Sequence, residues 1–182
     1  MRVFFAIELE DDLKKYLQNV QEEVRKYSLA GNFTLKDNFH LTLRFIGEQK
    51  SNQVEQLIAA LKETAVNVQP LELKLTKVGN FTKGNRKIIW AGLQKSKELD
   101  NLYSKLESVL QSKGYSKEDR GYSPHITLAR EVRIDNTEDL STNTKIESIF
   151  IKVKSISLME SKRIDNKLCY LPVEREELYS SL

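Results

Sequence analysis

The chain has 182 residues, of which 40% are hydrophobic and 30% are charged. This length and composition suit one domain with a buried core and exclude an intrinsically disordered chain. The formal net charge of +3 excludes a strongly basic, histone-like protein, so any attraction to a polyanion must come from a local patch. The apolar stretch near the start is too short for a signal peptide, and no run of about 18 apolar residues occurs. We therefore expect a cytoplasmic protein with no membrane contact.

The first half of the chain predicts strands that alternate with helices. Residues 2–9 are rich in β-forming side chains, and apolar residues at helical spacing predict a helix over 11–29. A short strand at 32–36 and a turn precede a strand at 40–47, which ends at Gly47. Ser51 is then expected to cap a helix that runs through Leu61.

The second half repeats this arrangement. Its strands are expected at 71–78, 87–93, 125–130, 149–160 and 169–174, and its helix at 97–113. The strands outnumber what two or three helices can wrap as alternating parallel units, which predicts an α+β fold with largely antiparallel sheets. No Pro-, Gly- or Ser-rich linker separates the halves, so residues 1–182 are expected to form a single two-lobed domain.

Both histidines of the chain occur in an H-x-T pattern within a predicted strand. Thr42 follows His40 by two positions, Thr127 follows His125 in the same way, and the two motifs lie 85 positions apart. Residues two apart in a strand share a face, so imidazole and hydroxyl can converge on one anion. A duplicated unit around a pseudo-two-fold axis would place two imidazoles on opposite sides of a phosphate. Displacement at phosphorus needs an acid and a base in that arrangement, and histidine can serve as either near neutral pH.

Two other interpretations apply to these residue types. A histidine in a strand is commonly structural, and a zinc site is a second possibility, but catalytic zinc generally needs three protein ligands. The chain has two histidines and no cysteine pair, so we expect no metal and no other cofactor. Cys169 is the only cysteine, which excludes an intrachain disulfide and favours a small buried apolar residue.

The chain contains, in this order, the segments MRVFFAIEL, DNFHLTLRFIGE, KIIWAGL and GYSPHITLAR. Together they resemble the two-histidine phosphoesterase superfamily, and within it the RNA 2′,3′-cyclic phosphodiesterases, historically called 2′-5′ RNA ligases. The resemblance covers almost the whole chain. It implies a bilobal fold of two antiparallel sheets flanked by helices, with the two motifs facing each other across a central cleft. It also implies metal-independent hydrolysis of a 2′,3′-cyclic phosphate on an RNA end or a nucleotide, leaving a 2′-phosphate.

The resemblance assigns roles to the two motifs. It makes His40 the proton donor to the leaving sugar oxygen and His125 the proton acceptor that activates water. Thr42 and Thr127 are implied to hold the phosphate. The near two-fold symmetry of the sequence does not by itself order the donor and the acceptor.

Further substrate contacts are implied outside the four motif residues. Arg130 occupies the position of a phosphate-contacting arginine, and Phe5 and Phe45 match positions whose rings border the nucleobase. Arg44 is added because period-two alternation places it on the strand face of His40 and Thr42. Trp90 and Tyr103 are expected in the core.

The substrate and the direction of the reaction are left open by the residues. The loop at 161–167 is more basic than a hairpin requires, and its lysines and arginine either contact an RNA backbone or are simply solvated. The basic residues considered for this contact are Lys162, Arg163 and Lys167, with Lys83, Arg86 and Lys87. The alternatives to hydrolysis are 2′-5′ RNA ligation at the same site and a non-catalytic RNA or nucleotide binder. No feature of the sequence indicates an oligomeric state.

Overall fold

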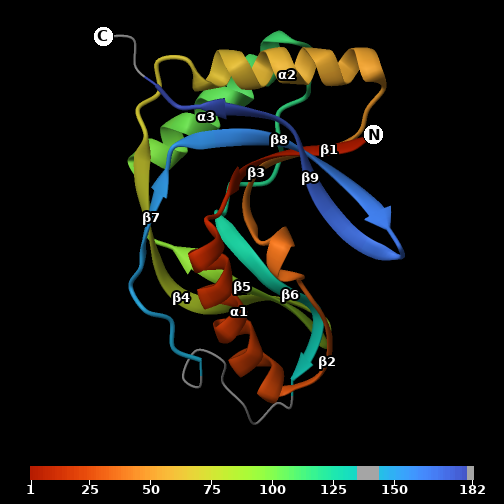
Figure 1. Cartoon of the computed structure of the whole chain (residues 1–182), viewed down its shortest axis with the longest axis vertical. Helices are drawn as coiled ribbons and strands as arrows, with labels where there is room; N and C mark the ends of the chain where they lie inside the picture. Colours follow the sequence, from red (N-terminus) through yellow and green to blue (C-terminus); the bar gives the residue numbers. More distant parts are fainter. Residues whose placement is uncertain (135–143, 180–182) are drawn as a thin grey trace.

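The computed structural model describes residues 1–134 and 144–179, which form three α-helices, one 3₁₀ helix and nine strands (Figure 1). The helices are α1 (Asp11–Lys26), η1 (Lys36–Asn38), α2 (Ser51–Ala65) and α3 (Lys97–Ser112). The strands are β1 (Arg2–Glu8), β2 (Ser28–Phe33), β3 (His40–Glu48), β4 (Leu71–Lys83), β5 (Arg86–Leu93), β6 (His125–Ile134), β7 (Phe150–Val153), β8 (Ser155–Ile164) and β9 (Lys167–Glu177). No helix in this part of the chain is both long and apolar enough to cross a membrane.

The strands form one curled sheet, and within the described residues every pairing between named strands is antiparallel (Figure 1). The strand order is β7-β4-β5-β6-β3-β1-β8-β9, and β2 pairs with β6 outside this path. The central strands β3 and β6 share only the residue pair Leu41–Ile126, which divides the sheet into two halves. The predicted α+β fold with antiparallel strands is confirmed, and the two expected sheets are joined at this pair.

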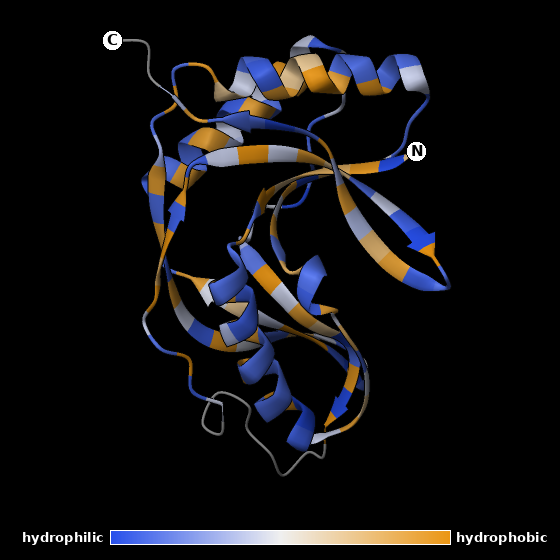
Figure 2. Ribbon diagram, viewed as in Figure 1, coloured by the Kyte–Doolittle hydropathy of each residue, from blue (hydrophilic) through white to orange (hydrophobic). Residues whose placement is uncertain are grey.

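The two halves are covered by different helices. Helix α1 packs against β6 and β2, whereas α2 packs against α3, β8 and β9. Leu17, Val20 and Val24 of α1 are buried in the main core, and the visible outer side of this helix is hydrophilic (Figure 2). Gln21 Nε2 donates to the backbone oxygen of Leu128 at 2.7 Å, which fixes α1 to β6. Because α1 covers one face of β6, the other face is left for a site.

Two β-α-β units lie in equivalent positions on either side of the Leu41–Ile126 pair. In the first unit, β1 and β3 pair antiparallel and are connected through α1; in the second, β5 and β6 are connected through α3. Glu8 pairs with His40 in the first unit, and Gly92 pairs with His125 in the second. Each histidine is therefore the first residue of the second strand of its unit, as the repeated sequence pattern predicts.

Several boundaries differ from those expected. Strand β2 begins at Ser28 instead of residue 32, because residues 28–33 pair with the far end of β6, and α1 accordingly ends at Lys26. The expected strand at 149–160 is two strands, β7 and β8. Ser51 is the first residue of α2 and not its cap, since the N-cap position is Lys50, whose N–H donates to Gln53 Oε1 at 2.9 Å.

Candidate active site

His40 and His125 lie next to each other at the junction of the two halves. Leu41 and Ile126, which form the connecting pair, are 1% and 0% exposed and face the core. The histidines and threonines that flank this pair are partly exposed, so alternation places them together on the opposite face. Antiparallel register about the pair sets His40 across from Thr127 and Thr42 across from His125. Four side chains that are far apart in sequence thus converge on one small region.

The two imidazoles present the same nitrogen to this region. His40 Nδ1 lies 2.7 Å from the carbonyl oxygen of Asn38, and His125 Nδ1 lies 2.7 Å from that of Ser123. A carbonyl only accepts hydrogen bonds, so we assign the ring proton of each neutral histidine to Nδ1. The Nε2 atoms then carry no proton in the neutral rings and are the atoms that can exchange protons with a substrate. In His40, this nitrogen accepts a hydrogen bond from Thr42 Oγ1 at 2.9 Å.

Burial keeps both rings neutral near neutral pH. Burial lowers the pKa of His40 to about 4, against a smaller opposing effect of the hydrogen bond to Asn38. Burial also lowers the pKa of His125, and the positive charge of Arg130 lowers the pKa of both rings further. His125 itself contributes to the lowered pKa of His40, which agrees with the closeness of the two rings. A bound anion would oppose these effects.

Aromatic side chains support each imidazole. Phe4 and Tyr170 lie 4.9 and 5.0 Å from the His40 ring, centroid to centroid, and Tyr170 meets that ring edge-on. Phe81 lies 5.1 Å from the His125 ring, also edge-on. These three residues were not identified from the sequence, because a phenylalanine or tyrosine in a strand gives the same pattern whether it packs in the core or beside a histidine of the site.

Trp90 lies at the edge of the site, whereas the sequence led us to expect it in the core. Its indole is half-buried, with its ring centroid 6.4 Å from that of His125. A Cβ atom added at Gly79 or at Gly92 would overlap this indole. The absence of a side chain at both glycines therefore leaves the space that the indole occupies beside His125.

Tyr103 of α3 is also only partly buried, contrary to expectation. Its ring stacks on that of Tyr122, with centroids 4.0 Å apart and planes within 3° of parallel. Tyr122 Oη donates to the backbone oxygen of Thr42 at 3.4 Å. The stacked pair thus lies between α3 and β3.

A β-bulge brings Arg130 to the same face as His125 and Thr127. Simple alternation would place residue 129 on that face, but Trp90 pairs with Thr127 while the preceding Ile89 pairs with Ala129. The extra residue turns Ala129 into the core, where it is 0% exposed, and leaves Arg130 exposed. The effect of its charge on both histidines agrees with this position.

The equivalent bulge in β3 corrects the prediction for Arg44. Ala6 pairs with Thr42 and the preceding Phe5 with Arg44, so one extra residue again interrupts the alternation. Phe45 then follows Thr42 on the exposed side and is 43% exposed, with the Arg2 guanidinium 5.0 Å from its ring centroid. Arg44 turns away from the face of His40 and Thr42, so period-two alternation is wrong at this position.

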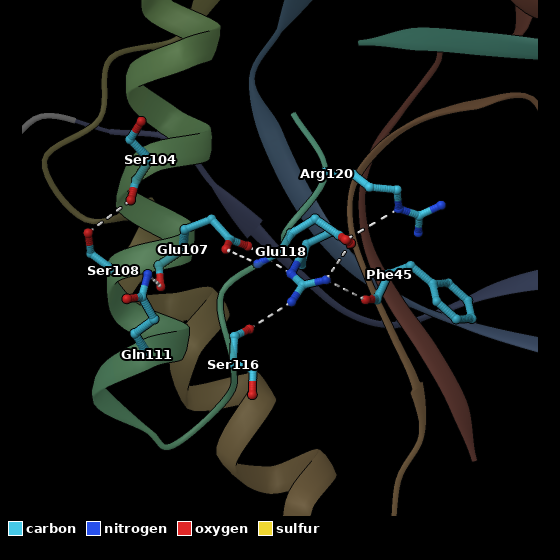
Figure 3. A network of polar contacts seen from close by, with 9 residues as sticks. Phe45, Ser104, Glu107, Ser108, Gln111, Ser116, Glu118 and Arg120 are labelled. Atoms are coloured by element: carbon cyan, nitrogen blue, oxygen red, sulfur yellow. Dashed lines mark hydrogen bonds and ion pairs between the residues drawn. The ribbon is translucent and has the colours of Figure 1, made fainter. Parts of the chain in front are cut away.

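Arg44 instead connects β3 to Glu107, which is buried, and to Glu118, which is partly exposed. Figure 3 shows Glu107, Ser116 and Glu118 of this network. Its Nε lies 2.8 Å from Glu107 Oε1 of α3, and its Nη1 donates to Glu118 Oε2 at 2.8 Å. Nη2 donates to the backbone oxygen of Ser116 at 2.8 Å, and Glu107 Oε2 accepts from the backbone N–H of Glu118 at 3.1 Å. The guanidinium of β3 is thereby tied to the segment that leads into β6.

The prediction for Phe5 does not fit its place in the fold. Its side chain is 0% exposed and belongs to the main hydrophobic core, so it presents no surface on which a nucleobase can stack. Phe4, one residue earlier, points to the opposite face and contacts the His40 ring instead. Phe4 is itself only 3% exposed, so neither phenylalanine of β1 presents an open ring face to a nucleobase.

The remaining predicted positions lie outside this cluster. The basic segment 161–167, expected as a loop, comprises the end of β8, the β8–β9 turn and the first residue of β9. In it, Lys162 pairs with Glu160 at 3.4 Å and Arg163 donates to the backbone oxygen of Asn166. Cys169 is only partly buried, contrary to expectation. Within residues 1–134 and 144–179, no group of three or more His, Cys, Asp or Glu side chains is arranged to hold a metal ion.

Comparison with known proteins identifies the family of the chain. The model of the 2′-5′ RNA ligase superfamily matches residues 9–165. The RNA 2′,3′-cyclic phosphodiesterase of Methanocaldococcus jannaschii is 28% identical over 141 residues, which is 77% of each chain. That of Aeropyrum pernix is 30% identical over 134 residues, covering 69% of this chain and 73% of the relative.

Solved structures show the same fold. A Thermus thermophilus protein superposes with a TM-score of 0.82 at 21% identity over 98% of both chains. Escherichia coli LigT complexed with 3′-AMP superposes with a TM-score of 0.77 at 25% identity over 97% of both chains. The match to the family model, which spans most of the sequence and both histidine motifs, shows that the chain belongs to the 2′-5′ RNA ligase superfamily.

Proposed function

We propose that the protein hydrolyses a 2′,3′-cyclic phosphate on an RNA end or a nucleotide and leaves a 2′-phosphate, without a metal ion. The observation that carries the proposal is the pair of imidazoles with unprotonated Nε2 atoms on one face, beside two threonines and Arg130. The curated relatives named RNA 2′,3′-cyclic phosphodiesterase support the same activity.

The proposed reaction is a displacement at phosphorus. A water oxygen forms a bond to phosphorus while His125 Nε2 accepts its proton, and the bond from phosphorus to the 3′ oxygen breaks. His40 Nε2 gives its proton to that oxygen, which becomes the 3′ hydroxyl. Thr42, Thr127 and Arg130 donate hydrogen bonds to the phosphate oxygens, which carry the charge of the transition state.

The donor role of His40 depends on the substrate in this scheme. Its lowered pKa means that the ring is neutral in the free protein at neutral pH. A bound phosphate anion raises the pKa of a neighbouring imidazole and also neutralises the charge of Arg130. The protonated ring is therefore expected in the complex, where it is needed.

The test uses an oligonucleotide that ends in a 2′,3′-cyclic phosphate, incubated in excess EDTA with product mapping. We expect a 2′-phosphate product, and we expect His40→Ala and His125→Ala each to lower kcat by about 10²–10⁴-fold. Turnover only with added metal, or a 3′-phosphate product, would refute the proposal.

The family match favours one second activity, the joining of RNA ends by a 2′-5′ linkage, since the cyclic end is shared by both reactions. Here a 5′ hydroxyl replaces water as the group whose proton His125 accepts. Rates of hydrolysis and joining on the same paired ends decide between them. His40 and His125 come from different halves of the sheet, so we also propose that residues 1–182 act as one two-lobed unit. We further propose that the protein acts on RNA in the cytoplasm.

A further inference from the structure

The face that carries His125 continues beyond the catalytic cluster into a separate hollow of about 480 Å³. The far end of β6 contributes Glu131 and Arg133, and β2 contributes Asn32. Asn85, in the β4–β5 turn, and Arg86, at the start of β5, complete the polar lining. None of these residues belongs to the site described above.

The hollow and the histidines lie on the same side of the sheet. Leu128 and Val132 of β6 are both 0% exposed and belong to the core, whereas Arg130 and Arg133 are exposed. Trp90 of β5 lies beside His125. Period-two alternation places Arg86, at the start of β5, on the same face of the strand as Trp90. One continuous open surface therefore leads from His125 past Arg130 to the hollow.

The donors in the hollow suit phosphate groups. Among the described residues, no carboxylate lies within ion-pair distance of Arg130 or Arg133. Arg86 pairs with Glu131, but both side chains are about half exposed, and exposed pairs are weak enough to rearrange around a stronger partner. Guanidinium groups bind phosphate through two parallel hydrogen bonds, and the amide groups of Asn32 and Asn85 add neutral donors.

The spacing excludes a single nucleotide as the shared occupant. Trp90 pairs with Thr127 and Lys87 pairs with Val132, so Arg133 lies level with Arg86, four residues of β5 from Trp90, which corresponds to about 13 Å along the strand. At about 3.4 Å per nucleotide of a stacked strand, this span holds about four nucleotides, and fewer when the strand is extended. A chain with several phosphates is needed to reach from the histidines to the hollow.

We propose that the hollow holds the backbone of a single-stranded RNA whose 3′ end lies at His40 and His125. The inference rests on the proposed function and extends it, since it makes the preferred substrate an RNA end and not a free cyclic nucleotide. The terminal phosphate contacts the histidines and Arg130, and Arg133 contacts a phosphate further toward the 5′ end.

The first experiment is a length series of substrates from a 2′,3′-cyclic mononucleotide to an octanucleotide with the same 3′ end. For the unmodified protein, kcat/KM should rise with length and level off at about four nucleotides, the number that the span to Arg133 holds. For Arg133→Ala, kcat/KM on the octanucleotide should fall at least about tenfold, mainly through KM, with the mononucleotide unchanged within about twofold. Arg175→Ala, which removes an equal charge from an exposed side chain of β9, is the matched control and should change neither.

Binding is measured separately, so that a failure of the proposed reaction does not hide the result. Fluorescence anisotropy with a labelled hexanucleotide that ends in a 2′-phosphate gives the affinity at several salt concentrations. Arg133→Ala should reduce the slope of log K against log salt by about 0.7, the value for one lost phosphate contact on a single strand. No length dependence in the unmodified protein, or equal losses for both arginine variants, would overturn the inference.

Discussion

We expect the buried ion pair of Arg44 and Glu107 to contribute more to the free energy of unfolding than the exposed ion pairs do, and the variant Glu107→Ala tests this. The two side chains are 13% and 6% exposed, and their closest atoms are 2.8 Å apart. Loss of one partner of a buried ion pair costs about 3–5 kcal/mol, because the other charge is left without compensation. Arg44 keeps Glu118 and the Ser116 carbonyl as partners, so we expect the lower end, about 3 kcal/mol.

This loss translates into a clear thermal shift. For a chain of this size, about 1 kcal/mol corresponds to about 2–4 °C, so Tm should fall by about 6–12 °C for Glu107→Ala. Differential scanning calorimetry measures Tm, and urea unfolding gives the free energy of unfolding. Alanine is a favourable helix residue, so helix propensity does not account for the shift.

The control is the pair of Glu63 and Lys113, which joins α2 to the C-terminal end of α3 with atoms 2.8 Å apart. Its carboxylate is 54% exposed, so Glu63→Ala should cost less than about 1 kcal/mol. The double variant Arg44→Met with Glu107→Leu removes both charges and should recover more than half of the lost stability. If Glu107→Ala and Glu63→Ala lower Tm equally, burial is not what makes the first pair important, and the reasoning fails.

Three further predictions concern the site itself. His40 has a pKa of about 4 in the folded protein and near 6.5 in the unfolded chain, so the unfolded chain binds more protons between these pH values. The free energy of unfolding should therefore rise by about 3 kcal/mol from pH 4 to 6.5 and then level off, and urea unfolding of His40→Gln should lack this part of the rise. Arg130→Met should lower kcat/KM on a cyclic nucleotide by about 10²–10³-fold with Tm unchanged, and a loss below about threefold would mean that no phosphate contact exists. Gly79→Ala should displace the indole of Trp90, the only tryptophan, and shift its fluorescence maximum, whereas an unchanged spectrum would contradict the close packing.

The elements that carry the chemistry were predictable from local pattern. Alternating apolar residues and the recurrence of H-x-T half a chain apart indicate two equivalent strands, and both strands begin at the histidines. The antiparallel α+β fold follows from the number of strands, and the family resemblance rests on segments spread along the whole sequence. These features depend on periodicity and spacing, which the sequence displays directly.

The side chains around the histidines were not predictable in the same way. Period-two alternation fails after Thr42 and again after Thr127, because each strand contains a bulge set by its partner strand. Arg44 was therefore placed on the wrong face. Its ion pair with Glu107 joins residues from β3 and α3 that are far apart in the chain, and nothing in the sequence specifies that contact.

The symmetry of the backbone does not extend to the electrostatics of the two rings. His40 lies between Phe4 and Tyr170, with Thr42 donating to its Nε2, and both features favour the neutral ring. His125 is packed against Phe81 and has no such hydroxyl donor among the described residues. The same low dielectric that disfavours an isolated charge on His40 strengthens its attraction to a bound phosphate. In the proposed reaction, the resting site thus holds two neutral imidazoles, and the substrate's own charge creates the acid that releases its 3′ oxygen.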